Sequence, residues 1–237
     1  MRRTNKKVEE NRKREEHRKQ LQEVKRRKRR EAPRLERAEP VLQEKERFLI
    51  VCEGANTEPS YFRQFRLSSA VIRAVGEGYN TTSLVERAEK LAQQDEYDQV
   101  WCVFDKDSFT PNNFNNAITM ATQKGMRVAY SNQAFEYWLI LHFEDHQGGA
   151  MSRRDYISKL NDYLSAYGLH FNDHSKKVTE PIFEMLLAKD EQTDKSRLAL
   201  AKVRAKRNYD RFDHHSPAME ESSTLVFALV AEMERFI

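Results

Sequence analysis

The sequence predicts an α/β fold built on a mainly parallel β-sheet. Short apolar runs rich in Val, Ile and aromatic residues end at turn residues, as buried parallel strands do, at 47–52, 99–104 and 126–130. Segments with helical patterns separate these runs, which favours right-handed βαβ crossovers. Acidic residues follow the first two runs, at the edge where open α/β sheets carry their sites.

Residues 1–46 are predicted to form a basic arm outside the folded body. They contain 18 Lys and Arg against 10 Asp and Glu and few large apolar side chains, so they cannot bury a core. The whole chain carries a net charge of +4, so residues 47–237 carry about −4. Because Glu, Lys, Arg and Gln favour helix, the arm is either extended or a solvated single helix that Pro33 and Pro40 would end.

The densest basic block of the arm is a candidate contact for nucleic-acid phosphates. It comprises Lys25, Arg26, Arg27, Lys28, Arg29 and Arg30. The alternative is a solvated tail that only keeps the protein dissolved. If the block binds phosphates, the affinity for nucleic acid depends strongly on salt concentration.

Strands and helices alternate along the first half of the body. Their expected order is strand 47–52, helix 57–65, strand 71–75, helix 81–91, strand 99–104, helix 111–124 and strand 126–130. Pro59 and Pro111 stand near the first turns of two helices, where proline is tolerated, and Thr81 can cap the third. Gly125 ends the helix before the last strand.

The chain after Ala134 looks helical to its end, with breaks at Gly148-Gly149, Gly168 and Pro181. We therefore expect residues 47–145 to form the α/β core and residues 146–237 a helical part.

Three carboxylates are expected at the carboxyl ends of the strands. Asp105 and Asp107 share a face if strand geometry continues past residue 104, because alternate residues point the same way. Glu53 follows the first strand, with Gly54 allowing close approach of a ligand. Such carboxylates repel one another, and Mg²⁺ or Mn²⁺ would relieve the repulsion. The alternative is that Asp105-Lys106-Asp107 is only a turn and Glu53 a solvated loop acid.

Three further residues are weaker candidates for the site. Glu58 is either a site carboxylate or a first-turn acid favoured by the helix dipole. Phe135, Trp138, Leu139 and His142 follow helical spacing, so His142 is either a core histidine or a phosphate-contacting or catalytic group. Glu136 lies off this apolar stripe, close to the end of the fourth strand, and is either a further metal-site carboxylate or the partner of a basic side chain.

A second basic stretch lies in the helical part. It comprises Lys195, Arg197, Lys202, Arg204, Lys206, Arg207 and Arg211. These residues form either a solvated helix face or a surface that faces nucleic acid.

Composition excludes several classes of protein. No apolar stretch approaches the roughly 20 residues of a membrane span, and the N-terminus lacks the apolar region of a secretory signal. Cys52 and Cys102 lack zinc-site spacing and are expected to be buried thiols in a reducing compartment. We therefore expect a cytoplasmic protein without membrane partners.

The strand-end motifs resemble those of known proteins. Glu-Gly after the first strand and Asp-x-Asp after a later one resemble the TOPRIM domain of topoisomerases, primases and small nucleases. The segments 49–58, 103–107 and 131–143 resemble the RloB family of phage-defence, or abortive-infection, proteins. The family often has Pro-Cys where this chain has Gln133-Ala134. The resemblance extends over roughly residues 47–230.

The resemblance implies a function and an assignment of roles. In TOPRIM enzymes the glutamate acts as general acid and base and the two aspartates bind Mg²⁺, which implies these roles for Glu53, Asp105 and Asp107. The expected activity is metal-dependent cleavage of DNA or RNA, tRNA included, in antiviral defence. The resemblance also implies an ATPase partner. The alternatives are a non-catalytic regulator that binds nucleic acid or the partner, and a phosphatase in which the first Asp of the Asp-x-Asp pair is a nucleophile.

Overall fold

The structure, a computed structural model, describes residues 3–31, 46–74, 81–107, 109–147, 149, 151–172 and 174–237. The chain divides into two compact units, Met1–Glu44 and Lys45–Ile237. None of the helices in the described ranges is both long and apolar enough to cross a membrane.

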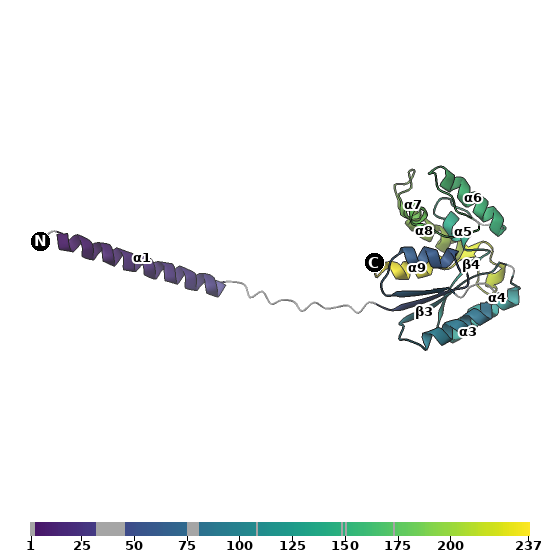
Figure 1. The fold of residues 1–237 in the computed structure, drawn as a ribbon, viewed down its shortest axis with the longest axis horizontal. Helices are drawn as coiled ribbons and strands as arrows, with labels where there is room; N and C mark the ends of the chain where they lie inside the picture. Colours follow the sequence, from purple (N-terminus) through teal and green to yellow (C-terminus); the bar gives the residue numbers. More distant parts are fainter. Residues whose placement is uncertain are drawn as a thin grey trace. The chain divides into compact units, whose positions relative to one another are not determined.

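The first unit contains one long helix, α1 (Arg3–Glu31) (Figure 1). The described side chains of α1 are exposed, including Lys25 and Arg26, while the side chains of 27–30 lie outside the described ones. Of the two predicted forms of the arm, this segment adopts the solvated helix. Pro33 and Pro40, which were expected to end the helix, lie outside the described residues.

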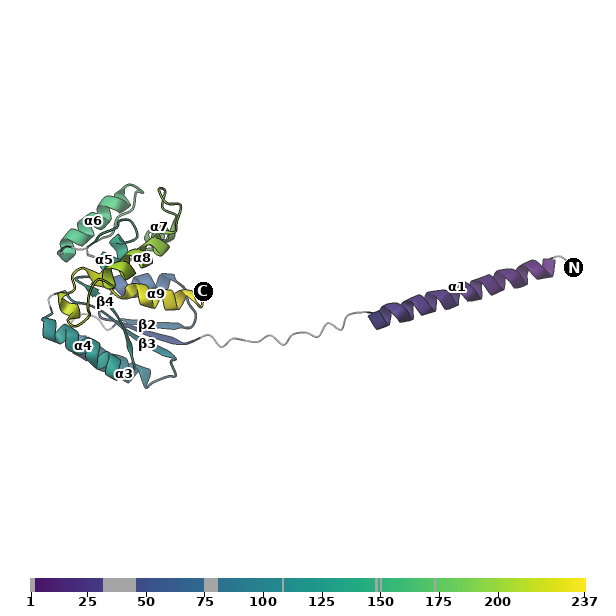
Figure 2. The same cartoon turned by 180° about the vertical axis from the view of Figure 1, so that it is seen from behind.

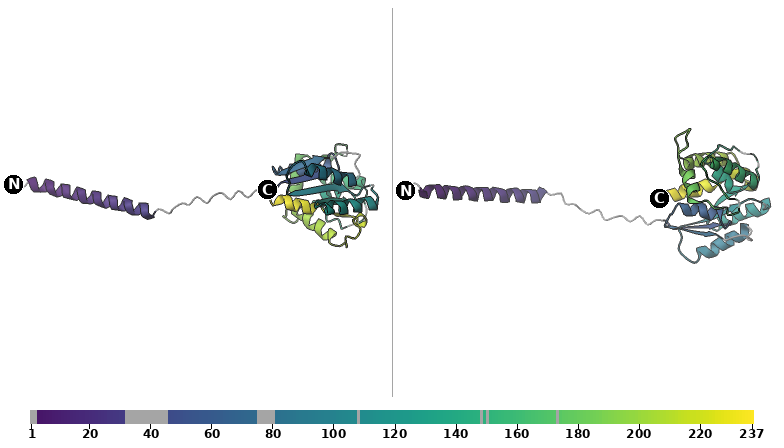
Figure 3. Two further views of the ribbon diagram at one scale, coloured as in Figure 1. Left: turned by 90° about the horizontal axis from the view of Figure 1, so that it is seen from below. Right: turned by 45° about the horizontal axis from the view of Figure 1, so that its top comes forward.

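The second unit is built on a five-stranded sheet in the order β2-β1-β3-β4-β5. The strands are β1 (Phe48–Cys52), β2 (Ala70–Ala74), β3 (Gln99–Asp105), β4 (Arg127–Asn132) and β5 (Ser223–Thr224). The first four run parallel, as predicted, side by side in the left view of Figure 3. The short strand β5 adds antiparallel to β4, which corrects the expectation that the chain after Ala134 is helical throughout.

Helices cover both faces of the sheet (Figure 2). They are α2 (Thr57–Gln64), α3 (Thr81–Ala92), α4 (Pro111–Gln123), α5 (Glu136–Ile140), α6 (Arg153–Ser165), α7 (Glu180–Leu187), α8 (Arg197–Tyr209), the 3-10 helix η1 (Pro217–Met219) and α9 (Val226–Glu234). The mixed α/β class predicted from the sequence is thus confirmed.

Alternate strand residues pack into two separate cores. Ile50 and Val103 face a core that α2 and the helices from α5 onward complete. Val51 and Phe104 face the other core, which α3 and α4 complete. Burial on both faces explains why the central strands read as continuous apolar runs.

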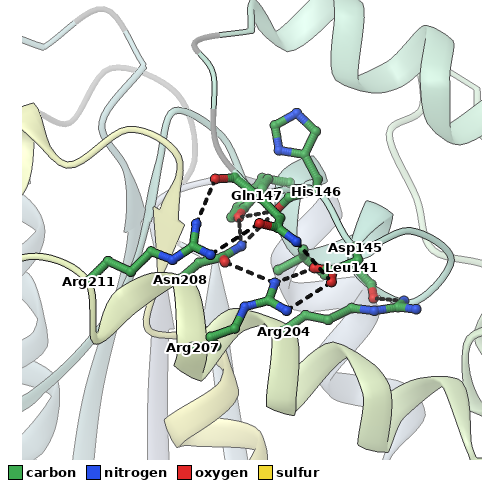
Figure 4. Close-up of polar contacts among 9 residues, drawn as sticks. Leu141, Asp145, His146, Gln147, Arg204, Arg207, Asn208 and Arg211 are labelled. Atoms are coloured by element: carbon green, nitrogen blue, oxygen red, sulfur yellow. Dashed lines mark hydrogen bonds and ion pairs between the residues drawn. The ribbon is translucent and has the colours of Figure 1, made fainter.

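Two arginines of α8 and Arg211, which lies just beyond its end, hold the loop after α5, as Figure 4 shows. The pairs are Arg204 with the Leu141 carbonyl, Arg207 with the Asp145 carboxylate, and Arg211 with the Gln147 carbonyl. We call these three pairs the α8 clamp. Much of the second basic stretch is therefore engaged within the fold, since Lys202 and Lys206 also pair with Glu234 and Asp210.

Candidate active site

The carboxyl edge of the sheet brings several carboxylates around one arginine, Arg153. Arg153 Nη2 lies 2.6 Å from Asp105 Oδ2, and Nη1 lies 3.2 Å from Asp107 Oδ2. Arg153 Nε lies 3.5 Å from Glu136 Oε2, which makes an ion pair without a hydrogen bond. We call Glu58, Asp105, Asp107 and Glu136 the carboxylate cluster.

The segment after β3 stays attached to the end of β4. The Lys106 N–H donates to the Ser131 carbonyl at 2.9 Å, and the Asp107 N–H donates to the Gln133 carbonyl at 2.9 Å. Asp107 adopts a φ of 35°, in the left-handed region that Asp tolerates better than most residues. Both aspartates contact the same guanidinium, but β3 ends at Asp105, so the turn at Asp107 and not a continued strand brings the two side chains together.

Glu53 stands beside Asp105 at the end of the neighbouring strand. Its N–H donates to the Val103 carbonyl at 2.9 Å, and its Oε2 accepts from the Asp105 N–H at 3.4 Å. The pKa of Glu53 is raised to about 7, chiefly by burial; the Asp105 N–H acts to lower it, and the charge of Glu58 acts to raise it. A carboxyl group with this pKa can both accept and donate a proton near neutral pH.

Glu58 lies in the first turn of α2, but its carboxylate is buried and only 5% of the residue is exposed. A Cβ on Gly54 would stand 2.3 Å from Glu58 Oε2, so the glycine leaves room for this carboxylate. The pKa of Glu58 is raised to about 7, chiefly by burial and in part by the charge of Glu136. The close approach expected at Gly54 is therefore that of Glu58.

Burial also raises the pKa of Asp105 well above its usual range, with Glu58 the largest contributing charge. It raises the pKa of Glu136, while Arg153 lowers it. Burial alone would lower the pKa of Arg153, but Asp105 and Glu136 raise it. One guanidinium therefore stabilises a cluster whose negative charges destabilise one another.

The donor set fits a hard divalent cation. Among the described residues, no three His, Cys, Asp or Glu side chains are already arranged to hold a metal ion. However, Asp105 Oδ1 and Glu136 Oε2 are buried without a hydrogen-bond partner among those residues, and carboxylate oxygens are the ligands that Mg²⁺ prefers.

His142 lies in the aromatic core and is not part of the carboxylate cluster. Its ring centroid is 4.9 Å from that of Trp138 and 6.5 Å from that of Tyr61. Nδ1–H donates to the Trp138 carbonyl at 3.0 Å, and burial lowers the pKa of His142 to about 3. The imidazole is therefore neutral at physiological pH, as a core histidine is.

Two cations of the site were not anticipated from the sequence. Arg153 is the first residue of α6, and Lys176 lies near enough to lower the pKa values of Glu58 and Glu136. The capping pair Ser152 and Asp155 marks the start of a helix in the sequence, but not its position beside the carboxylates. The basic block 25–30 belongs to the other unit of the chain.

Comparison with known proteins identifies the family. A family model described as RloB-like protein matches residues 48–233, which include Glu53, the carboxylate cluster and Arg153. No curated protein and no solved structure gives a match. The matched range extends over nearly the whole second unit and well over half of the sequence. The chain therefore belongs to the RloB-like protein family.

Proposed function

We propose that this protein is a metal-dependent phosphodiesterase that cleaves DNA or RNA with a TOPRIM-like domain. The observation that carries the proposal is the convergence of Asp105, Asp107 and Glu136 on one guanidinium at the carboxyl edge of a parallel sheet. Open α/β sheets bind their ligands at this edge. Buried carboxylates whose charge is not balanced by nearby cations are typical of sites that hold metal ions or move protons.

Asp105 and Asp107 would hold Mg²⁺ or Mn²⁺, with Glu136 as a further oxygen donor. When bound, the metal would stabilise negative charge on the phosphate. Glu53 stands beside this pair with a pKa raised to about 7. It can accept a proton from the water whose oxygen bonds to phosphorus. The bond from phosphorus to the leaving sugar oxygen breaks, and that oxygen takes up a proton from solvent.

The biological setting is proposed from the family. Membership in the RloB-like family and the TOPRIM-like motifs support a role in antiviral defence together with an ATPase partner. Free, buried Cys52 and Cys102 suit the reducing cytoplasm. The basic arm would add sequence-independent affinity for nucleic acid.

One observation favours a second candidate function. Arg153 lies among the very carboxylates that would hold the metal. A permanent ion pair of this kind suits a regulator that binds nucleic acid or a partner protein and cleaves neither.

The test is a cleavage assay with the purified full-length protein. Single- and double-stranded DNA, RNA and tRNA are incubated with Mg²⁺, with Mn²⁺ or with EDTA. We expect cleavage with metal only, and its loss in Asp105→Asn and in Asp107→Asn. Asp95→Asn is the matched control, because Asp95 is half-exposed and pairs with Arg47 before β3 begins.

Two results would count against the proposal. Cleavage that survives EDTA would exclude the metal mechanism, and full activity of Asp105→Asn would exclude this site. Binding of nucleic acid without cleavage under either metal would favour the regulator.

A further inference from the structure

Arg153 is the only cation that the described ion pairs place on the carboxylate cluster, and it contacts three acids from two elements. Asp105 reaches it from the last residue of β3, Asp107 from the turn that follows, and Glu136 from the first residue of α5. The side chains of Asp105 and Glu136 are 7% and 2% exposed, so their charges depend on a nearby cation. Arg153 thus joins parts of the site that would otherwise repel one another.

One guanidinium does not supply a hydrogen bond to every buried oxygen of these acids. Asp105 Oδ1 and Glu136 Oε2 are buried without a hydrogen-bond partner in the part of the chain that the structure describes. Arg153 Nε also lacks a hydrogen-bond partner among the described residues, because its distance to Glu136 Oε2, 3.5 Å, is too long for a hydrogen bond. Three acidic groups contact a single guanidinium, and buried polar groups of this kind normally have partners. A compact divalent cation would supply the missing charge to the same oxygens.

The position of Arg153 allows its side chain to leave without unfolding the helix. Its backbone belongs to the first turn of α6, which the reciprocal bonds of Ser152 and Asp155 fix independently of the guanidinium. The side chain is 30% exposed, so it borders solvent that a ligand can reach. A guanidinium binds phosphate oxygens with the same paired N–H groups that it offers to carboxylates.

We propose that Arg153 is an exchangeable counterion: it holds the carboxylate cluster together in the metal-free protein, a divalent cation displaces it, and the released guanidinium binds a substrate phosphate. The metal and the phosphate in this scheme rest on the proposed function. The scheme makes Arg153 a positioning residue for the cluster and a phosphate-binding residue after metal has bound.

The first test measures binding of Mn²⁺ alone by isothermal titration calorimetry, without nucleic acid. Arg153→Gln removes the competing charge, so we expect it to bind Mn²⁺ about tenfold more tightly than the unmodified protein, the scale of losing a partly buried ion pair. Arg154→Gln is the matched control, because Arg154 is the next residue and is exposed. Equal or weaker Mn²⁺ binding by Arg153→Gln would overturn the exchange.

A second measurement does not depend on the folding of Arg153→Gln. In the unmodified protein, the Nε–H NMR signal of Arg153, assigned by its absence from Arg153→Lys, should shift when Mg²⁺ is added. A signal that stays unchanged at saturating Mg²⁺ would show that the guanidinium remains in place, and would likewise overturn the exchange.

A third measurement tests phosphate binding. With metal bound, Arg153→Gln should bind inorganic phosphate several-fold more weakly than Arg154→Gln. Equal affinities would refute phosphate capture.

Failure of this scheme and failure of the proposed function give different results. Metal exchange in a protein that cleaves nothing would refute the nuclease and retain the exchange. Metal-dependent cleavage with unchanged Mn²⁺ affinity in Arg153→Gln would retain the nuclease and refute the exchange.

Discussion

Gly54→Ala is predicted to displace the Glu58 carboxylate from the site. The added Cβ would stand 2.3 Å from Glu58 Oε2 and 2.8 Å from Cδ, whereas ordinary contacts begin near 3.4 Å. The carboxylate must therefore move by about 1 Å. It is buried, so this movement disturbs packed neighbours.

The cost follows from this overlap. Overpacking of a buried site costs about 1–3 kcal/mol of the free energy of unfolding. For a body of this size each kcal/mol lowers Tm by about 2–4 °C, so we expect a loss of about 2–12 °C. Activity should fall as well, because Glu58 lies in the carboxylate cluster.

A double-mutant cycle tests the cause. Tm is measured in EDTA for the unmodified protein, Gly54→Ala, Glu58→Ala and the double variant. If the clash is with the carboxylate, Gly54→Ala should cost almost nothing in the Glu58→Ala background. An equal loss of Tm in both backgrounds would refute the reasoning, because the methyl group would then clash with something else.

Three further predictions address pH, proton transfer and the arm. Because the pKa of Glu58 is raised, its contribution to stability is present below about pH 4.5 and lost as pH rises through about 7. In EDTA, the Tm of Glu58→Gln should therefore exceed that of the unmodified protein by an amount that grows across this window. A difference in Tm that is constant with pH would contradict this. Glu53→Gln should lose cleavage and keep nucleic-acid binding, since an amide cannot accept the proton; cleavage at the parental rate would exclude Glu53 as the proton-transfer group. Removal of residues 1–44 deletes a net charge of about +8, so a titration at several salt concentrations should show weaker binding and a shallower salt slope, with cleavage per bound substrate retained; equal slopes would show that the arm does not bind phosphates.

The strands and the positions of the acids could be predicted because both follow from local sequence. A run such as Phe48–Cys52 is buried on both faces, and the residue after such a strand in a parallel sheet lies at the same edge as its counterparts. Glu53 and Asp105 were placed together in this way.

The short strand β5 could not be predicted, because two residues carry no periodic pattern. Ser223 and Thr224 join the sheet through tertiary contacts, such as the 3.0 Å hydrogen bond between the Ser131 and Thr224 hydroxyl groups. Arg153 was missed for a similar reason. Its neighbours indicate a helix start, and only the three-dimensional path of the chain brings its guanidinium to acids 17 to 48 residues away.

The α8 clamp bears on how variants of this protein are interpreted. It holds the 141–147 loop shortly before the chain reaches Arg153, so a change in α8 or at Arg211 can alter the carboxylate edge without contacting any ligand. A genetic screen for loss of function should therefore recover Arg207 and Arg211 alongside the acids. Variants at these arginines would resemble variants with defective nucleic-acid binding, yet what they lose is a contact within the fold. Salt dependence of binding would separate the two, because losing an internal support leaves the number of phosphate contacts unchanged.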